Sequence, residues 1–233
     1  VAVNLVGGTL FVTGLALIYA TTGTLNMADL ARYTADLHGE RAGIVTTASM
    51  VLMLVFALKA AVFPVFFWLP DSYPVVPSGM NGFFAGLMTK VGVYSLLRVF
   101  VMTFQQEGNE IVTQTLLVLS GFTMILGVLG AVCQWEIRRI LSWHVISQVG
   151  YMVMGIGLTA NPAIARAATA GTVFYIVHHI IVKSSLFLLG DLAEHVTGKR
   201  GLKNMGGALV LAPVASAMFF VAAVSLAGMP PFS

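Results

Sequence analysis

The sequence predicts an all-α protein built as a polytopic membrane helix bundle. Hydrophobic residues make up 58% of the chain and charged residues only 9%, whereas soluble domains carry about 25% charged residues. The mean hydropathy is +0.92, and apolar runs of about 20 residues, long enough to cross a bilayer, recur along the chain. A large soluble enzyme with buried helices is the alternative, and the scarcity of charge argues against it.

About seven segments are long and apolar enough to be membrane-spanning helices. Short polar connectors separate them, so neighbouring helices should run antiparallel. At least one of the spans contains a proline in its interior and is expected to be broken there. The expected spans cover residues 1–28, 42–69, 78–104, 111–134, 141–160, 167–190 and 207–229.

Both ends of the chain suggest a piece of a longer protein. Val1 opens directly into an apolar run, without an initiator Met or the basic start of a signal peptide. The other end stops just after the pair Pro230 and Pro231, inside an apolar segment. We therefore expect residues 1–233 to form a single transmembrane domain, the central fragment of a longer chain truncated at both ends.

Several kinds of chemistry find no support in the sequence. A net charge of +3 without a basic surface gives no reason to expect a nucleic-acid partner. The single cysteine, Cys133, lies in an apolar run and can form neither an internal disulfide nor a CxxC metal site. Nucleotide-binding loops and the common hydrolase and protease motifs are absent from the sequence. We expect no cofactor, no metal and no enzymatic activity.

Three lysines fall inside the apolar runs: Lys59, Lys90 and Lys183. A lysine at the centre of a membrane helix costs about 2.5–3.5 kcal/mol. Each lies roughly eight to ten residues from the nearer end of its span, which makes it hard for the ammonium group to reach the interface by snorkelling. Lysine can also switch between charged and neutral forms when it is desolvated. The three lysines therefore predict a polar interior that relays protons, or else a ligand pocket.

The segment 174–191, FYIVHHIIVKSSLFLLGD, combines a lysine with two histidines. Tyr175, His179 and Lys183 recur every four residues and so share one helix face. His178 lies about 100° away and should face a different neighbour. Histidine titrates closest to neutral pH, so both histidines are candidate proton relays. Adjacent histidines do not share a helix face, which argues against a zinc site.

A second polar stripe lies on the fifth expected span, where His144, Ser147, Gln148 and Tyr151 follow one another at helical spacing. Side chains of this kind form hydrogen bonds between helices in membrane bundles. They would equally well line a hydrated path. The sequence leaves these two interpretations open.

Prolines and charged groups mark further positions. Pro64 follows Lys59 by five residues and should break its helix, exposing the carbonyl of Ala60. Pro230 and Pro231 mark a second break near the C-terminus. Broken helices at mid-membrane are typical of ion-handling proteins. Charged residues near span ends are expected to be interfacial: Glu136 with Arg138 and Arg139, and Asp191 with Glu194, where Asp191 is a candidate partner for a cation.

Four segments together resemble the proton-translocating antiporter-like subunits of respiratory complex I and of Mrp-type multisubunit cation/proton antiporters. The resemblance covers nearly the whole chain, and HHIIVK is most similar to the D-type branch of the Mrp antiporters. The segments are KAAVFPVFFWLPDSYPVVPSGMNGFFAGLMTKVGVYSLLR, ILSWHVISQVGYMVMGIGL, HHIIVKSSLFLLGDLAEHVTGKRGLKNMGG and SLAGMPPFS.

The resemblance implies a 14-helix fold with two inverted five-helix units and a central chain of lysines. Lys59 matches the lysine of the first broken helix, which in the family pairs with a glutamate one helix before this chain begins. Lys90 and Lys183 match the next two lysines of that chain. Asp191 stands where the family more often has a glycine, which is a departure from the pattern.

The resemblance also implies a role. We expect a proton-relaying, multi-pass subunit of a Na⁺/H⁺ antiporter in the cell membrane of a prokaryote, embedded in lipid and assembled with other membrane subunits. The alternative is the equivalent proton-pumping subunit of NADH-quinone oxidoreductase or of a membrane-bound hydrogenase. A purely structural membrane scaffold is a third possibility.

Overall fold

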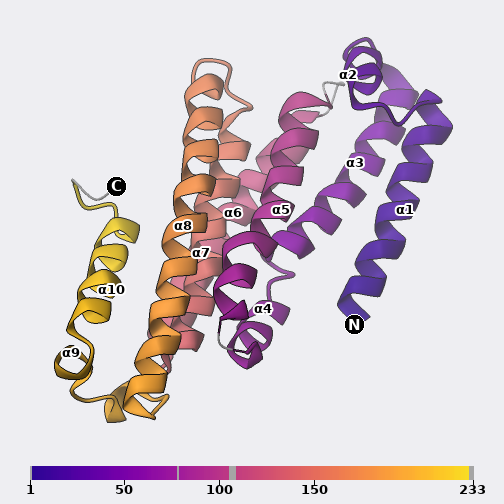
Figure 1. Ribbon diagram of the computed structural model, residues 1–233. Helices are drawn as coiled ribbons and strands as arrows, with labels where there is room; N and C mark the ends of the chain where they lie inside the picture. The colour runs from indigo at the N-terminus through magenta and orange to yellow at the C-terminus, as the bar shows by residue number, and fades with distance from the viewer. Residues whose placement is uncertain (1, 78, 105–108, 231–233) are drawn as a thin grey trace.

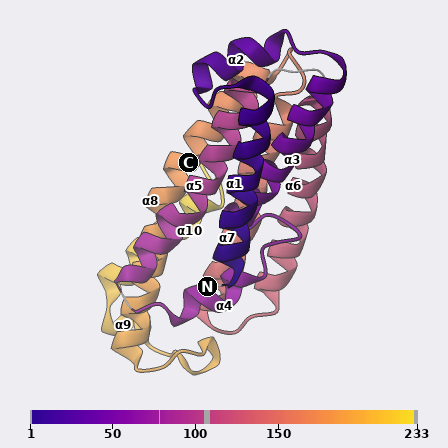
Figure 2. The same cartoon turned by 90° about the vertical axis from the view of Figure 1, so that its right-hand side faces the viewer.

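The computed structural model describes residues 2–77, 79–104 and 109–230, and within them the chain is helical without β-strands. Figure 1 shows the helices standing side by side in an elongated row, with α1 at one end and α10 at the other. Figure 2 views this row from the end at which α1 lies. The elements are α1 (Ala2–Thr22), α2 (Met27–Ala35), α3 (Gly39–Ala60), α4 (Trp68–Ser72), η1 (Tyr73–Val75), α5 (Met80–Met102), α6 (Asn109–Val132), α7 (Ile137–Leu158), α8 (Ala165–Thr197), η2 (Leu202–Asn204), α9 (Ala208–Leu211) and α10 (Pro213–Leu226).

Six of the described helices, α1, α3, α5, α6, α7 and α8, are long and apolar enough to cross a membrane. They correspond to the first six predicted spans. The seventh predicted span, 207–229, differs, because it is divided into the single turn α9 and the 14-residue α10. At 1.5 Å per residue α10 is about 21 Å long, shorter than the ~30 Å hydrocarbon core of a bilayer.

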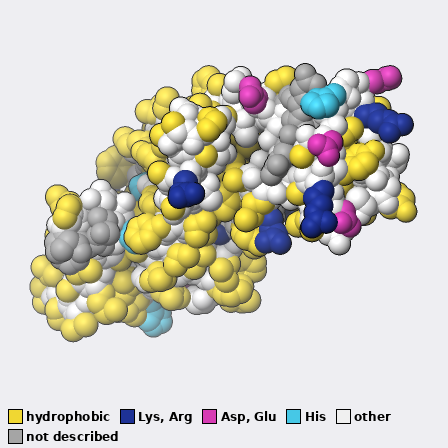
Figure 3. Space-filling view, turned by 90° about the horizontal axis from the view of Figure 1, so that it is seen from above, with side chains coloured by type: hydrophobic (Ala, Val, Ile, Leu, Met, Phe, Trp, Pro, Cys, Tyr) yellow, Lys and Arg dark blue, Asp and Glu magenta, His cyan; other side chains and the backbone are white. Residues whose placement is uncertain are grey.

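Helix α2 was not expected as a separate element, since the first span was predicted to continue to residue 28. The structure ends α1 at Thr22, and the side chain of Asn26 then caps α2 by accepting a hydrogen bond from the backbone N–H of Ala28. Seen from above, charged side chains gather over this end of a mostly hydrophobic surface (Figure 3). The exposed charged residues of α2 and its flanks are Asp29, Arg32, Asp36, Glu40 and Arg41.

The predicted break near Pro64 is present. The first part, α3, ends at Ala60, Ala61 takes a left-handed conformation with φ 63°, and helical structure resumes with α4 at Trp68. The span predicted as 42–69 is therefore a long helix and the start of a short one, joined by an irregular stretch.

Polar backbone groups at the break have partners, as irregular backbone at membrane depth requires. The indole Nε1 of Trp68 donates to the carbonyl of Leu58 at 2.9 Å, and the N–H of Phe63 donates to Thr123 Oγ1 of α6 at 2.9 Å. The N–H of Val62 donates to the carbonyl of Ala57 at 2.9 Å. These contacts fix the end of α3 against its neighbours.

Helices α5, α7 and α8 pack against one another and form the centre of the bundle. Small residues allow the close approach: a Cβ on Gly86 of α5 would lie only 2.2 Å from Ser184 Oγ of α8. The polar residues carried at mid-length by these three helices are therefore brought together.

Candidate functional site

Two of the three lysines that the sequence places within apolar spans lie in the centre of the bundle. Lys183 of α8 is fully buried, and Lys90 of α5 is 3% exposed. The ammonium group of Lys90 donates to the carbonyl of Ala85 at 2.7 Å. The two lysines are close enough to interact electrostatically. Because like charges repel strongly in a buried setting, this pair disfavours the state in which both ammonium groups are charged.

Lys183 makes its direct side-chain contact with α7. Its Nζ lies 3.1 Å from Nδ1 of His144, and Nε2 of His144 lies 3.4 Å from the amide nitrogen of Gln148. The hydroxyl of Tyr175 donates to Oε1 of Gln148. A continuous line of polar side chains thus runs from Lys183 through His144 and Gln148 to Tyr175.

His179 lies between these groups. It is fully buried and close enough to Lys90, Lys183 and His144 to feel their charges. Neither of its ring nitrogens has a hydrogen-bond partner among the described residues. Buried polar groups in folded proteins are nearly always hydrogen-bonded, to protein or to ordered water. We call Lys90, His144, His179 and Lys183 the lysine–histidine cluster.

His178 points elsewhere, as its position on the helix predicts. Its Nε2 lies 2.9 Å from Oγ of Ser225, near the end of α10. It therefore connects α8 to the segment that precedes Pro230 and Pro231. Pro230 lies exposed in a turn after α10, and Pro231 falls outside the described residues.

A cavity of about 680 Å³ adjoins the cluster. It lies between α7, α8 and the end of α10, and His144 and Gln148 reach it from the cluster side. Tyr151, which is 46% exposed, lies on the same cavity wall as Tyr175. Both interpretations of the α7 stripe agree with this geometry: His144 and Gln148 bond to residues of α8, and together with Tyr151 they line the cavity.

Ser147 is separated from that stripe. It lies on the face of α7 that packs against α6, where a Cβ on Gly127 would come within 2.4 Å of the Ser147 backbone nitrogen. Its buried hydroxyl has no hydrogen-bond partner among the described residues. Ser147 therefore lies at the α6–α7 contact and not at the cavity.

Lys59 lies apart from the other two lysines. It occupies the last turn of α3, one residue before the helix ends, and it is exposed. Its Nζ donates to the side-chain oxygen of Asn4 on α1 at 2.7 Å. The expectation of a mid-helix position is corrected: the break places Lys59 at a helix end, beside the freed carbonyl groups.

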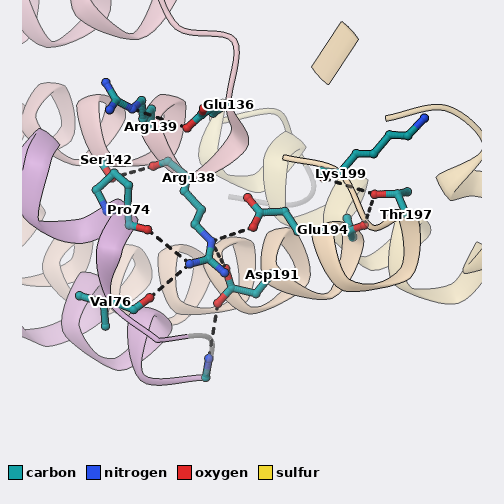
Figure 4. A network of polar contacts seen from close by, with 12 residues as sticks. Pro74, Val76, Glu136, Arg138, Arg139, Ser142, Asp191, Glu194, Thr197 and Lys199 are labelled. Carbon is teal, nitrogen blue, oxygen red and sulfur yellow. Dashed lines mark hydrogen bonds and ion pairs between the residues drawn. The ribbon is translucent and has the colours of Figure 1, made fainter. Parts of the chain in front are cut away.

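A buried charged group, missed by sequence reasoning, lies where α7 begins and α8 ends (Figure 4). Nε of Arg138 lies 2.8 Å from Asp191 and 3.1 Å from Glu194, and all three side chains are almost completely buried. We call these three residues the charged edge. Of the predicted charge group, Glu136 and Arg139 form an exposed pair 3.5 Å apart, whereas Arg138 is buried and pairs with α8. Asp191 of α8 pairs with a cation, and that cation is Arg138 of α7.

The whole chain, residues 1–233, matches the family model described as NADH:quinone oxidoreductase/Mrp antiporter, transmembrane. The chain belongs to this family. It is 47% identical over 234 residues to the D-type Na⁺/H⁺ antiporter subunit of Alkalihalophilus pseudofirmus, and 36% identical over 230 residues to that of Bacillus subtilis. These matches cover 100% and 99% of the chain but only 46% and 45% of the relatives, so the chain spans less than half of their length.

Two solved membrane complexes contain chains with the same fold. The Mrp complex of a Dietzia species matches with a TM-score of 0.88 at 36% identity, over 99% of this chain and 41% of that one. An archaeal respiratory complex, the membrane-bound sulfane sulfur reductase, matches with a TM-score of 0.86 at 25% identity, over 98% and 45%. The helical membrane fold is thus confirmed, and the chain is a multi-pass protein of a prokaryotic cell membrane.

Proposed function

We propose that this chain is the proton-relaying part of a D-type subunit in a multisubunit Na⁺/H⁺ antiporter. The lysine–histidine cluster moves protons between helices α5, α7 and α8. The chain acts as part of a transporter, without a cofactor, and assembles with other membrane subunits. Support for the antiporter over a respiratory subunit comes from the names of the relatives at 47% and 36% identity, compared with 25% for the respiratory complex.

The observation that carries the proposal is that three buried titratable side chains, Lys90, His179 and Lys183, lie close enough to interact, with the half-buried His144 in contact with Lys183. A lysine that is buried at a cost is retained where the protein uses it, and two neighbouring lysines cannot both hold a charge cheaply. A proton that arrives on one of them therefore favours release from the other. Histidine, which exchanges protons near neutral pH, lies against both.

Access to the cluster is supported by the cavity beside His144. A proton that enters between Tyr151 and Tyr175 reaches His144, and His144 lies 3.1 Å from Lys183. His179 is close enough to interact with both Lys183 and Lys90 and would pass the proton from one to the other. From Lys90 the relay would continue toward Lys59 and the broken helix, and His178 with Ser225 would continue it toward α10.

The test is transport by the full-length subunit in its complex. Lys183→Ala should lower Na⁺/H⁺ antiport in vesicles by roughly a hundredfold, the usual contribution of a positioned proton-transfer group. Lys183→Arg should be equally inactive, because arginine keeps its charge but does not release its proton. Ser185→Ala, two residues away on the same helix, is the matched control and should transport normally.

Assembly of the complex must be followed in the same membranes, so that lost transport is not lost protein. Normal antiport by an assembled Lys183→Ala complex would contradict the relay and favour a purely structural role. The transport assay also tests the respiratory alternative. If proton movement by the unmodified complex depends on quinone reduction and not on Na⁺, the antiporter assignment is replaced.

A further inference from the structure

The two ends of the lysine–histidine cluster differ. Toward the end of α7, His144 reaches a cavity of about 680 Å³. Toward the start of α7, His144 borders a smaller cavity of about 210 Å³ together with Leu141 and Leu186, and its lining is otherwise apolar. The charged edge lies farther along, beyond Phe187. Lys183, Phe187 and Asp191 follow one another at four-residue spacing on α8, so they share a face. Lys183 and Asp191 are therefore separated by about 12 Å along the helix.

Phe187 fills the space between these two charged positions. It is fully buried, and so is Leu69 of α4, while Leu186 is 2% exposed. The ring of Tyr73, itself 2% exposed, meets Phe187 edge to face with the ring centroids 6.2 Å apart. Aromatic pairs in this geometry pack closely and attract each other.

Tyr73 turns its polar end away from Phe187. Its hydroxyl donates to the carbonyl of Phe84 on α5 at 3.2 Å. The ring, and not the hydroxyl, therefore faces the path along α8. Along this face of α8 the side chain between Lys183 and Asp191 is the ring of Phe187, and the ring of Tyr73 lies against it.

The charged edge holds Tyr73 in this position. Nη1 of Arg138 donates to the carbonyls of Pro74 and Val76 at 3.4 and 3.2 Å, so the residues that directly follow Tyr73 are tied to α7 (Figure 4). Asp191 completes the link from α8, since its Oδ2 accepts a hydrogen bond from the N–H of Gly79 at 3.4 Å.

We propose that Tyr73 and Phe187 form an aromatic barrier that blocks protons between Lys183 and the charged edge, and that Arg138 is the positioning residue that keeps the barrier closed. This inference rests on the proposed function. Release of the segment that follows Tyr73 would separate the two rings and let water join Lys183 to the carboxylates of the charged edge. While the barrier is closed, the cluster is connected only to the cavity beside His144.

The test is passive proton leak through the full-length complex in liposomes, driven by an imposed pH gradient without Na⁺. Phe187→Ala removes one ring and should raise the leak about tenfold, which corresponds to a small decrease in the free-energy barrier to proton passage. Leu188→Ala, which truncates the adjacent and 46% exposed side chain of α8, is the control and should remain tight. Phe187→Leu, a milder change that keeps the site apolar, should leak to an intermediate extent.

The route of the leak is tested with a double variant. If protons pass through the cluster, Lys183→Ala combined with Phe187→Ala should abolish the leak, whereas general damage to the bundle would leave it unchanged. A leak that persists in the double variant overturns the proposal, and so does an assembled Phe187→Ala or Phe187→Leu complex that is as tight as the unmodified one.

Arg138 is tested in the same assay. Arg138→Ala should leak as Phe187→Ala does, while Arg139→Ala, which removes only the exposed pair with Glu136, should not. Equal tightness of both arginine variants would remove Arg138 from the proposal. Failure here is distinct from failure of the proposed function, because the latter is decided by antiport in Lys183→Ala alone.

Discussion

At the scale of single residues, His144 links the buried cluster to the cavity. It contacts Lys183 on one side and Gln148 on the other, and it is the member of the cluster that lines the cavity wall. Lys90 and His179 have no such exposure. A proton exchanged with the cavity therefore passes His144 before it reaches the lysines.

His144→Phe should keep the volume of the ring but remove both nitrogens, and we expect antiport to fall roughly a hundredfold. Met154→Leu is the control, because it changes an apolar side chain that lines the same cavity and should leave antiport unchanged. Antiport rates in vesicles, normalised to the amount of assembled complex, measure both. Equal rates for the two variants would show that His144 is not on the path.

The buried lysines and histidines could be predicted from the sequence, because their cost in an apolar run is visible in the residue order alone. The buried pair of Arg138 with Asp191 could not, since each residue lies near a span end and is interpreted as interfacial until α7 and α8 are placed side by side. The acidic pair Asp191 and Glu194, three residues apart on one helix face, was the signal available for it.

At the scale of elements, the broken helix depends on how closely α5 approaches it. Gly92 of α5 lies against the last residue of α3, so that a Cβ there would come 2.5 Å from the backbone nitrogen of Ala60. The proline predicted the break from the sequence. The end of α3 at Ala60 was not predictable, because it is set by the partners of the freed backbone groups on α4 and α6.

Gly92→Ala should therefore push the end of α3 away from α5 and destabilise the protein by about 1–3 kcal/mol. Gly121→Ala in α6 is the matched control, since its Cβ would meet nothing within 4 Å and alanine favours a helix. Thermal unfolding of the purified complex in detergent compares the two. A Gly92→Ala complex as stable as Gly121→Ala would contradict the close packing of the break.

At the scale of the whole molecule, the bundle places a polar interior between two different ends. The cavity beside His144 lies toward one end, and the aromatic barrier with the charged edge closes the interior toward the other. The order of the helices followed from the apolar runs. The asymmetry depends on contacts between α4, α7 and α8 that no single segment encodes.

The central claim is that the interior around His179 is a proton path and therefore hydrated. The most direct measurement is a cryo-EM map of the full complex at a resolution that shows ordered water. We predict waters bonded to the ring nitrogens of His179 that join Lys90 to Lys183, since those nitrogens are buried without a partner among the described residues. An interior packed dry around His179, with no water between the two lysines, would contradict the account.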